Sequence, residues 1–182
     1  LGTDWPIIQA PMAGVQGAAL AVAVCRAGAL GSLPAAMLTP EALAAELAAL
    51  REGAAGRPYS VNFFCHQPPA PDAQREAAWR AALAPYYAEH QIDAASIPAG
   101  PGRRPFDEAA LALLASAPPP VVSFHFGLPD LRLVTLLKQL GCKILSSATT
   151  VEEGRWLEAH GADAVIAQGL EAGGHRGHFL SD

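Results

Sequence analysis

The sequence is poor in cysteine and in positive charge, and both shortages narrow the class of protein. Three cysteines occur, and their spacing matches neither a Cys-x-x-Cys pair nor a zinc site, so we expect reduced thiols in a cytoplasmic protein. Twelve lysines and arginines stand against 17 acidic residues, which leaves a net charge of −5. Because nucleic-acid binding needs a basic surface that neutralises phosphates, nucleic acid is not an expected partner.

Long apolar runs are also missing, although 51% of the residues are hydrophobic. The stretches 18–24 and 42–50 are shorter than a membrane span and rich in alanine, and no signal-peptide pattern is present at the start. We therefore expect a globular protein with no membrane association. The chain lacks an initiator Met and stops soon after a glycine-rich loop, which suggests part of a longer protein.

Short apolar runs alternate with helical stretches along the chain. The expected strands are short and apolar, and they cover residues 7–10, 30–33, 60–64, 121–124, 143–146 and 164–167. The expected helices of this alternation cover residues 18–27, 40–50, 131–140 and 151–160. Repeated strand–helix units predict an α/β fold with a parallel sheet and right-handed crossovers. We expect the last strand, 164–167, to be buried.

The segment at about 67–120 interrupts this alternation. It begins with several prolines and contains two further helical stretches, at 76–89 and 106–117. Its apolar content is too low for an independent core, so we interpret it as a helical insertion within a single domain that covers residues 1–182.

Both a doubly wound sheet and a barrel are compatible with the alternation. A dinucleotide-binding fold is disfavoured because no G-x-G-x-x-G follows the first expected strand. Polar residues or glycines follow nearly every strand, and a (β/α)8 TIM barrel builds its site from the ends of many strands. We therefore expect a TIM barrel that is incomplete here, because about six βα units are present and eight are needed.

The last expected strand leads into a glycine-rich loop, 168–178, that carries two histidines. Glycines let backbone amides approach a ligand closely, and ordering such a loop is costly unless something binds there. An imidazole that titrates near neutral pH can serve as an acid or a base. The loop is therefore the first candidate for a functional site, with a flexible surface loop as the alternative.

A known family is matched in four segments of the chain, which cover residues 6–14, 61–64, 122–127 and 167–177. These segments resemble the nitronate monooxygenases, formerly called 2-nitropropane dioxygenases, which are FMN-dependent (β/α)8 barrels. The resemblance implies oxidation of alkyl nitronates or nitroalkanes by O2 to carbonyl compounds and nitrite, with His175 and His125 as catalytic residues. It also implies that FMN is bound by Ala10, Met12, Asn62, Gln168, Gly173 and Gly174.

Several alternatives stay open at this point. The chain could instead belong to an NAD(P)H-dependent FMN reductase of the enoyl-ACP or quinone type, or be a non-catalytic partial chain that needs a partner. Asn62 could be a strand-end cap and His125 a satisfied core residue. A metal site of His125, His175 and His178 with Asp163 is disfavoured, because Asp163 precedes its strand.

Two expectations concern residues 1–182 on their own. The seventh and eighth strands hold the cofactor phosphate in such barrels, so this segment is expected to bind FMN poorly. Its unpaired apolar strand edges are expected to make it oligomerise or aggregate, and a homo-oligomer is a possible assembly of the protein.

Overall fold

The computed structural model describes residues 1–97 and 103–181. The chain divides into two compact units, of which the first comprises residues 1–66 with 103–182 and the second residues 67–102. The first unit carries the whole sheet, and the described part of the second contains α3 (Ala73–Glu89) and the 3-10 helix η1 (Ala94–Ser96). The second unit begins its long helix at Asp72, whose side chain accepts hydrogen bonds from the Gln74 and Arg75 amides.

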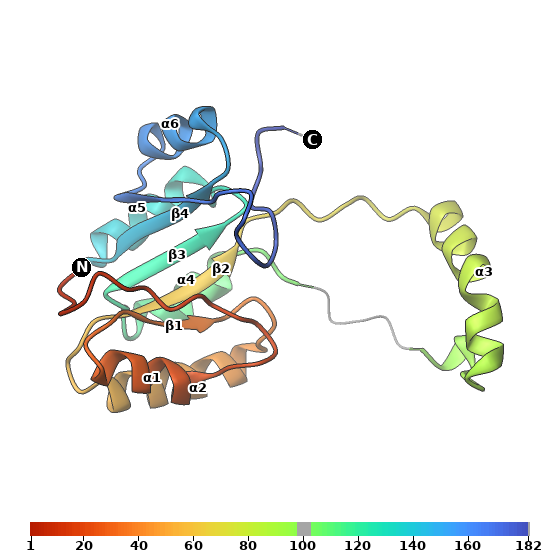
Figure 1. The fold of residues 1–182 in the computed structure, drawn as a ribbon, viewed down its shortest axis with the longest axis horizontal. Helices are drawn as coiled ribbons and strands as arrows, with labels where there is room; N and C mark the ends of the chain where they lie inside the picture. Colours follow the sequence, from red (N-terminus) through yellow and green to blue (C-terminus); the bar gives the residue numbers. More distant parts are fainter. Residues whose placement is uncertain (98–102, 182) are drawn as a thin grey trace. The chain divides into compact units, whose positions relative to one another are not determined.

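The sheet of the first unit is parallel throughout. Its strands are β1 (Gly31–Pro34), β2 (Tyr59–Phe64), β3 (Val121–His125), β4 (Lys143–Ala148) and β5 (Ala164–Ala167). They lie in the order β1-β2-β3-β4-β5, so each strand pairs with the next one in the sequence. A doubly wound sheet reverses its strand order, whereas a barrel does not. The expected α/β class and barrel topology are therefore confirmed, as a partial barrel (Figure 1).

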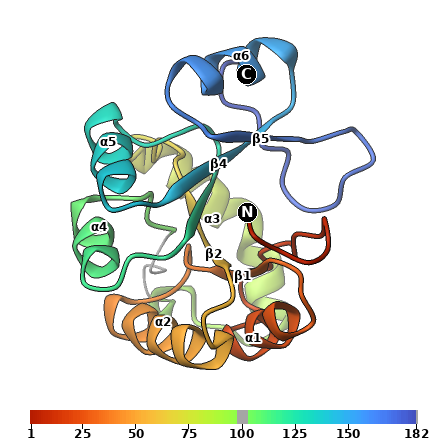
Figure 2. The same ribbon diagram turned by 90° about the vertical axis from the view of Figure 1, so that its left-hand side faces the viewer.

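The helices of the first unit lie on one side of this sheet. They are α1 (Ala18–Arg26), α2 (Pro40–Ala54), α4 (Glu108–Ala115), α5 (Leu131–Gln139) and α6 (Val151–Ala159). Figure 2 shows them around the curved sheet, while the N-terminal segment and the loop after β5 run along the other side. The Thr39 and Thr150 hydroxyls cap α2 and α6 by accepting amide hydrogen bonds. None of the described helices combines the length and the apolar character needed to cross a membrane.

The two faces of the sheet differ in chemistry, because successive side chains in a strand point to opposite faces. The face under the helices is an apolar core that includes Leu33, Val61, Phe63, Val122, Phe124 and Ile144. The other face carries buried polar side chains, among them Ser32, Ser60, Asn62, Ser123 and Ser147. The polar face is therefore the one on which a ligand with hydrogen-bonding groups can be held.

Residues 7–10 do not form the expected first strand. Ile8 makes an isolated parallel bridge to Leu30, with hydrogen bonds from the Leu30 amide to the Ile7 carbonyl and from the Gln9 amide to the Leu30 carbonyl. The amides of residues 7, 9 and 11 would face β1 in a longer ladder, and Pro11 has no amide hydrogen to donate. Of the six expected strands, five form and one is reduced to this bridge.

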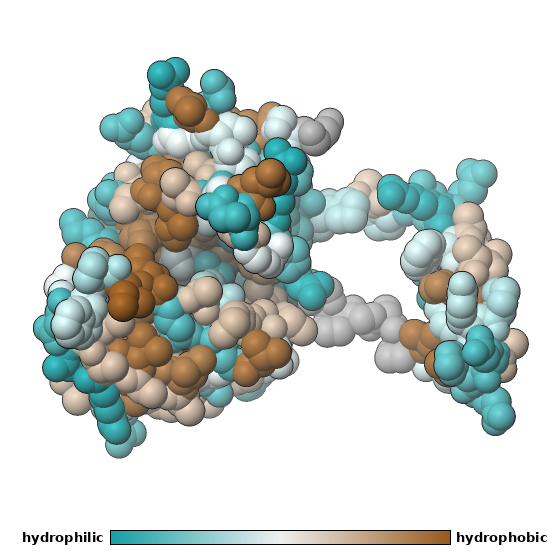
Figure 3. All heavy atoms as spheres, in the orientation of Figure 1, coloured by the Kyte–Doolittle hydropathy of each residue, from teal (hydrophilic) through white to brown (hydrophobic). Residues whose placement is uncertain are grey.

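The expectation that 164–167 is a buried strand is wrong. All four residues of β5 are exposed, because among the described residues β5 pairs with β4 alone. The N-terminal segment also leaves large apolar side chains exposed, including Ile7, Ile8 and Met12. Figure 3 shows such side chains gathered on the face over which this segment runs.

The close packing of α1 on β1 generates a stability prediction. A Cβ at Gly31 would overlap the Ala21 carbonyl oxygen and lie 2.8 Å from Cys25 Sγ. Gly31→Ala should therefore lower the free energy of unfolding by about 1–3 kcal/mol, measured by urea denaturation. The matched control is Gly154→Ala within α6, where the nearest atom to the added Cβ is the Ala148 Cβ at 4.0 Å. This control should raise the unfolding free energy by about 0.5–1 kcal/mol through helix propensity.

Candidate functional site

The carboxyl ends of β3, β4 and β5 bring three polar side chains together. His125 is the last residue of β3, and Ser147 lies beside it because Phe124 pairs with Ser146 in the parallel register. Gln168 follows β5 directly, and its backbone amide donates to the Ala148 carbonyl at 2.9 Å. Parallel strands end at the same edge of a sheet, so side chains far apart in the sequence meet there.

Both ring nitrogens of His125 are hydrogen-bonded. Nε2 lies 3.3 Å from the backbone carbonyl oxygen of His175, and Nδ1 lies 3.1 Å from Ser147 Oγ. Because a carbonyl can only accept, Nε2 carries the proton, and Nδ1 then accepts from the Ser147 hydroxyl. Burial lowers the pKa of His125 below its ordinary value of 6.5, and the hydrogen bond to His175 offsets part of this effect. The ring is therefore neutral at neutral pH.

The Gln168 side chain closes the glycine-rich loop onto the strand ends. Its Nε2 donates to the His175 carbonyl at 2.8 Å, and its Oε1 accepts from the Gly177 amide at 2.7 Å. Position 177 has no room for a side chain, since a Cβ would lie 2.5 Å from His125 Cε1. The His175 carbonyl thus receives hydrogen bonds from two strand ends, which fixes the backbone at this residue.

The His175 ring is exposed and packs among aromatic side chains. Its centroid lies 5.8 Å from Phe64, 5.8 Å from Phe126 and 6.5 Å from His125. Phe126 adopts a φ of 67°, which is rare for a bulky residue and is tolerated where the surrounding structure enforces it. We call Phe64, His125, Phe126 and His175 the aromatic cluster. It puts an accessible imidazole against an apolar wall at the strand ends.

The expected FMN-binding residues fall into two groups. The first comprises Asn62 and Gln168, whose side chains form hydrogen bonds within the chain. Asn62 is only 6% exposed, and its Nδ2 donates to the Ser123 hydroxyl at 3.0 Å and to the Ser123 carbonyl at 3.2 Å. It lies two residues before the aromatic cluster on β2, one layer deeper on the polar face. Gln168, as described above, uses both ends of its amide within the loop. These two side chains therefore have internal partners.

The other expected FMN-binding residues are exposed. Ala10 and Met12 lie on the N-terminal segment, and Gly173 and Gly174 lie in the loop. A Cβ at either glycine would meet no atom within 4 Å, and Gly174 has a φ of 80° that favours glycine. The backbone amides of this turn are thus accessible to a ligand from outside.

Two buried polar atoms in the first unit lack hydrogen-bond partners among the described residues. They are Gln16 Oε1 and His66 Nδ1. Gln16 also donates from Nε2 to the Ser32 carbonyl at 3.0 Å, and the His66 ring packs 6.3 Å from that of Phe126. Sequence reasoning did not select either atom, because no local pattern shows whether a polar side chain is satisfied in the fold. An unpartnered buried polar atom is costly, so both are positions where a bound group would be stabilising.

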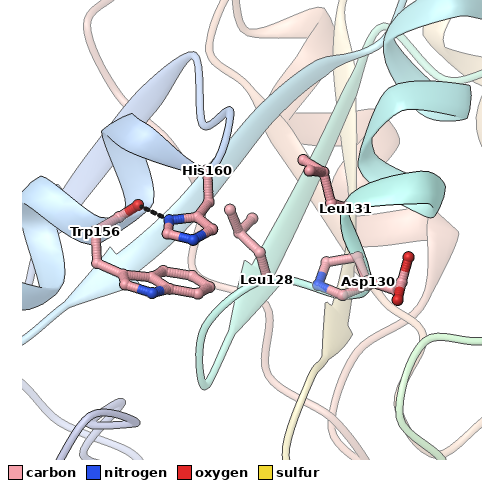
Figure 4. A pocket seen from close by; sticks show the side chains of 6 residues that line it. Leu128, Asp130, Leu131, Trp156 and His160 are labelled. Carbon is pink, nitrogen blue, oxygen red and sulfur yellow. Dashed lines mark hydrogen bonds between the residues drawn. The ribbon is translucent and has the colours of Figure 1, made fainter.

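A separate small pocket lies between the start of α5 and helix α6. Its volume is about 240 Å³, and it is lined by Leu128, Pro129, Asp130, Leu131, Trp156 and His160. His160 stacks on Trp156 with ring centroids 3.8 Å apart, and its Nδ1 lies 2.7 Å from the Trp156 carbonyl (Figure 4). None of the lining residues belongs to the aromatic cluster, so this pocket is distinct from the candidate site.

The chain is similar to known proteins over its whole length. The family model for nitronate monooxygenase matches residues 1–182. A nitronate monooxygenase of Paraburkholderia phytofirmans is 44% identical over 186 residues, which cover 100% of this chain and 50% of that protein. A nitronate monooxygenase of Pseudomonas aeruginosa is also 44% identical, over 98% of this chain and 51% of that protein.

A solved structure shows the same similarity in three dimensions. The nitroalkane oxidase from Streptomyces ansochromogenes superposes with a TM-score of 0.85 and 44% identity, over 100% of this chain and 51% of that one. The chain spans about half the length of the curated relatives it matches.

The environment of His125 predicts a pH dependence of stability. The pKa of His125 is lowered on folding, so below pH 6.5 the unfolded chain takes up a proton more readily than the folded one. The unfolding free energy should therefore fall as pH decreases from 6.5 towards the folded pKa, by at most about 1.4 kcal/mol per pH unit. Urea denaturation of the wild type and of His125→Asn between pH 8 and pH 5 checks this.

The comparison at pH 8 is the internal control, because there neither state of His125 is charged. A difference between the two proteins at that pH reports lost packing and hydrogen bonds alone. His125→Asn should show a shallower decline below pH 6.5, and an identical decline in both proteins would contradict the assignment.

Proposed function

The chain belongs to the nitronate monooxygenase family, and we propose that it contributes the strand-end histidines to a flavin-dependent enzyme that oxidises alkyl nitronates or nitroalkanes with O2 to carbonyl compounds and nitrite. The observation that carries the proposal is the exposed His175 ring at the carboxyl edge of a parallel sheet, held by its own backbone carbonyl. Such an edge is where barrels of this class keep their chemistry.

FMN is the proposed cofactor, and the residues present fit it. Its phosphate needs close backbone amides, which the open turn at Gly173 and Gly174 offers, and its flavin ring needs a few amide-type partners. The unpartnered Gln16 Oε1, whose Nε2 donates to the Ser32 carbonyl, is a further acceptor near the end of β1 and supports the proposal. We assign FMN binding to Ala10, Met12, Asn62, Gln168, Gly173 and Gly174. When bound, FMN supplies the redox chemistry by taking electrons from the nitronate and passing them to O2.

His175 is the proposed catalytic residue. Among the described residues neither of its ring nitrogens has a hydrogen-bond partner, so the imidazole is free to contact a substrate. It takes the α-proton of a nitroalkane, or donates a hydrogen bond to a nitronate oxygen. Phe64 and Phe126 pack beside it, and apolar neighbours strengthen the electrostatic interaction of the ring with a charged substrate.

His125 is the proposed companion of His175. Both of its nitrogens are bonded, to Ser147 and to the His175 carbonyl. It therefore contributes to the reaction by holding the loop that carries His175, while its neutral ring adds no charge beside the substrate.

Two measurements on the purified intact protein test the proposed function. The absorbance spectrum should show bound flavin, and O2 consumption should start on addition of an alkyl nitronate. If the flavin is instead reduced rapidly by NADH or NADPH and no O2 is consumed with nitronate, the protein is a flavin reductase. A colourless protein without turnover would indicate a non-catalytic chain.

The role of His175 generates a mutational prediction. His175→Ala should retain its flavin spectrum and lose turnover with a nitroalkane by roughly 10²- to 10⁴-fold, since general acid–base catalysis is worth that much. His125→Ala should lose less.

The matched control is His178→Ala, three residues further along the same loop, where Nδ1 lies 3.3 Å from the Arg176 carbonyl. Its turnover should stay within a few-fold of wild type. Unchanged nitroalkane turnover in His175→Ala would remove His175 from the mechanism.

A further inference from the structure

Glu153 is a buried carboxylate to which the proposed reaction assigns no role. It lies in the first turn of α6, three residues after the cap Thr150, and is 1% exposed. The five ion pairs formed among the described residues do not include it. Burying a charge without a cationic partner is costly unless hydrogen bonds replace the lost water. The hydrogen-bond partners of Glu153 therefore indicate its role.

Four hydrogen bonds are donated to this carboxylate, from two segments of the chain. Oε2 accepts from the amide and the hydroxyl of Thr149, at 2.6 Å and 2.8 Å. Oε1 accepts from the amides of Phe179 and Leu180, at 2.8 Å and 3.4 Å. Burial by itself raises the pKa of Glu153, and these hydrogen bonds outweigh it, so the net pKa is below the ordinary value. The group is a charged acceptor at neutral pH.

The carboxylate therefore joins the end of β4 to the exit of the glycine-rich loop. Phe179 comes four residues after His175 and is 26 residues from Glu153 in the sequence. Its ring packs against the Trp156 ring, with centroids 5.2 Å apart, and against the Gly127 backbone, where an added Cβ would lie 3.1 Å from it. Glu153 fixes the backbone of Phe179, and these two contacts fix its side chain.

The loop is thus held at two places, on either side of His178. Gln168 binds the His175 carbonyl and the Gly177 amide, and Glu153 binds the amides that follow. Without the carboxylate, the Phe179 and Leu180 amides lose their acceptor and the exit of the loop is free to shift. Misplacing a reacting group by about 1 Å can cost roughly 100-fold in rate, even from a change remote from the chemistry.

We infer that Glu153 is a positioning residue for His175, which it places by anchoring the exit of the loop that carries it. This inference rests on the proposed function for its effect on turnover, whereas the anchoring itself is a property of the fold. The substitution Glu153→Gln keeps the size of the side chain but turns an amide hydrogen towards one of the two pairs of donors.

A double-mutant cycle with His175→Ala tests the inference in the intact, flavin-loaded enzyme. Glu153→Gln should lower kcat with a nitroalkane about 10- to 100-fold while changing KM little. In the His175→Ala background the same substitution should lower kcat less than about threefold, because the group it positions is already gone. Equal losses in both backgrounds would overturn the inference, since a merely structural role is additive.

Glu152→Gln is the matched control, because Glu152 is the adjacent, exposed carboxylate of the same helix turn. It should leave kcat unchanged in both backgrounds. If Glu153→Gln does not fold, Thr149→Val removes one of the four hydrogen bonds to the carboxylate. It should then cause a several-fold loss that is again absent in His175→Ala, and an additive loss would overturn the inference equally.

Hydrogen exchange separates this inference from the proposed function. In Glu153→Gln the amides of residues 168–181 should exchange at least tenfold faster, while those of β4 exchange as in wild type. This result is expected even if the wild type does not oxidise nitronates, in which case the proposed function fails and the anchoring stands. Unchanged exchange in residues 168–181 would overturn the anchoring whatever the activity.

Discussion

The parallel pairing of β2, β3, β4 and β5 is the constraint on which the candidate site depends. Because each strand runs parallel to its neighbours, every strand carries its carboxyl end to the same edge. His125 and Ser147 meet there by register, although 22 residues separate them. A shift by one residue in the pairing of β3 with β4 would turn Ser147 to the other face and leave His125 Nδ1 without its donor.

The backbone carbonyl of His175 shows how this edge controls a loop. It accepts from the His125 ring at the end of β3 and from the Gln168 side chain after β5, so the ends of two strands of the sheet determine where one loop residue lies. A glycine-rich segment loses much conformational entropy when it is ordered, and hydrogen bonds to rigid strand ends offset that cost. The loop can therefore be rich in glycine, with open amides at Gly173 and Gly174, and still present one imidazole in a fixed place.

One face of the sheet stabilises the fold by apolar packing, and the other face carries the polar groups that can hold a ligand. The helix side is a continuous apolar cluster, in which Phe63, Phe106 and Phe124 pack edge to face. The polar side buries serine and asparagine beside a small apolar cluster of Leu30, Val121 and Leu145. Asn62 and Ser123 satisfy one another there by a 3.0 Å hydrogen bond, which lets a polar layer be buried without a large desolvation cost.

The sequence by itself determined the α/β class, the family and the loop that carries His175, because periodicity and motifs are local. It did not determine that the first strand is reduced to a bridge, or that β5 is exposed. The tertiary structure alone decided the tautomer of His125, whose partner is 50 residues away, and the partners of Glu153. The Thr-x-x-Glu spacing marks Glu153 as part of a helix start, but its second pair of donors comes from a segment that only folding brings near.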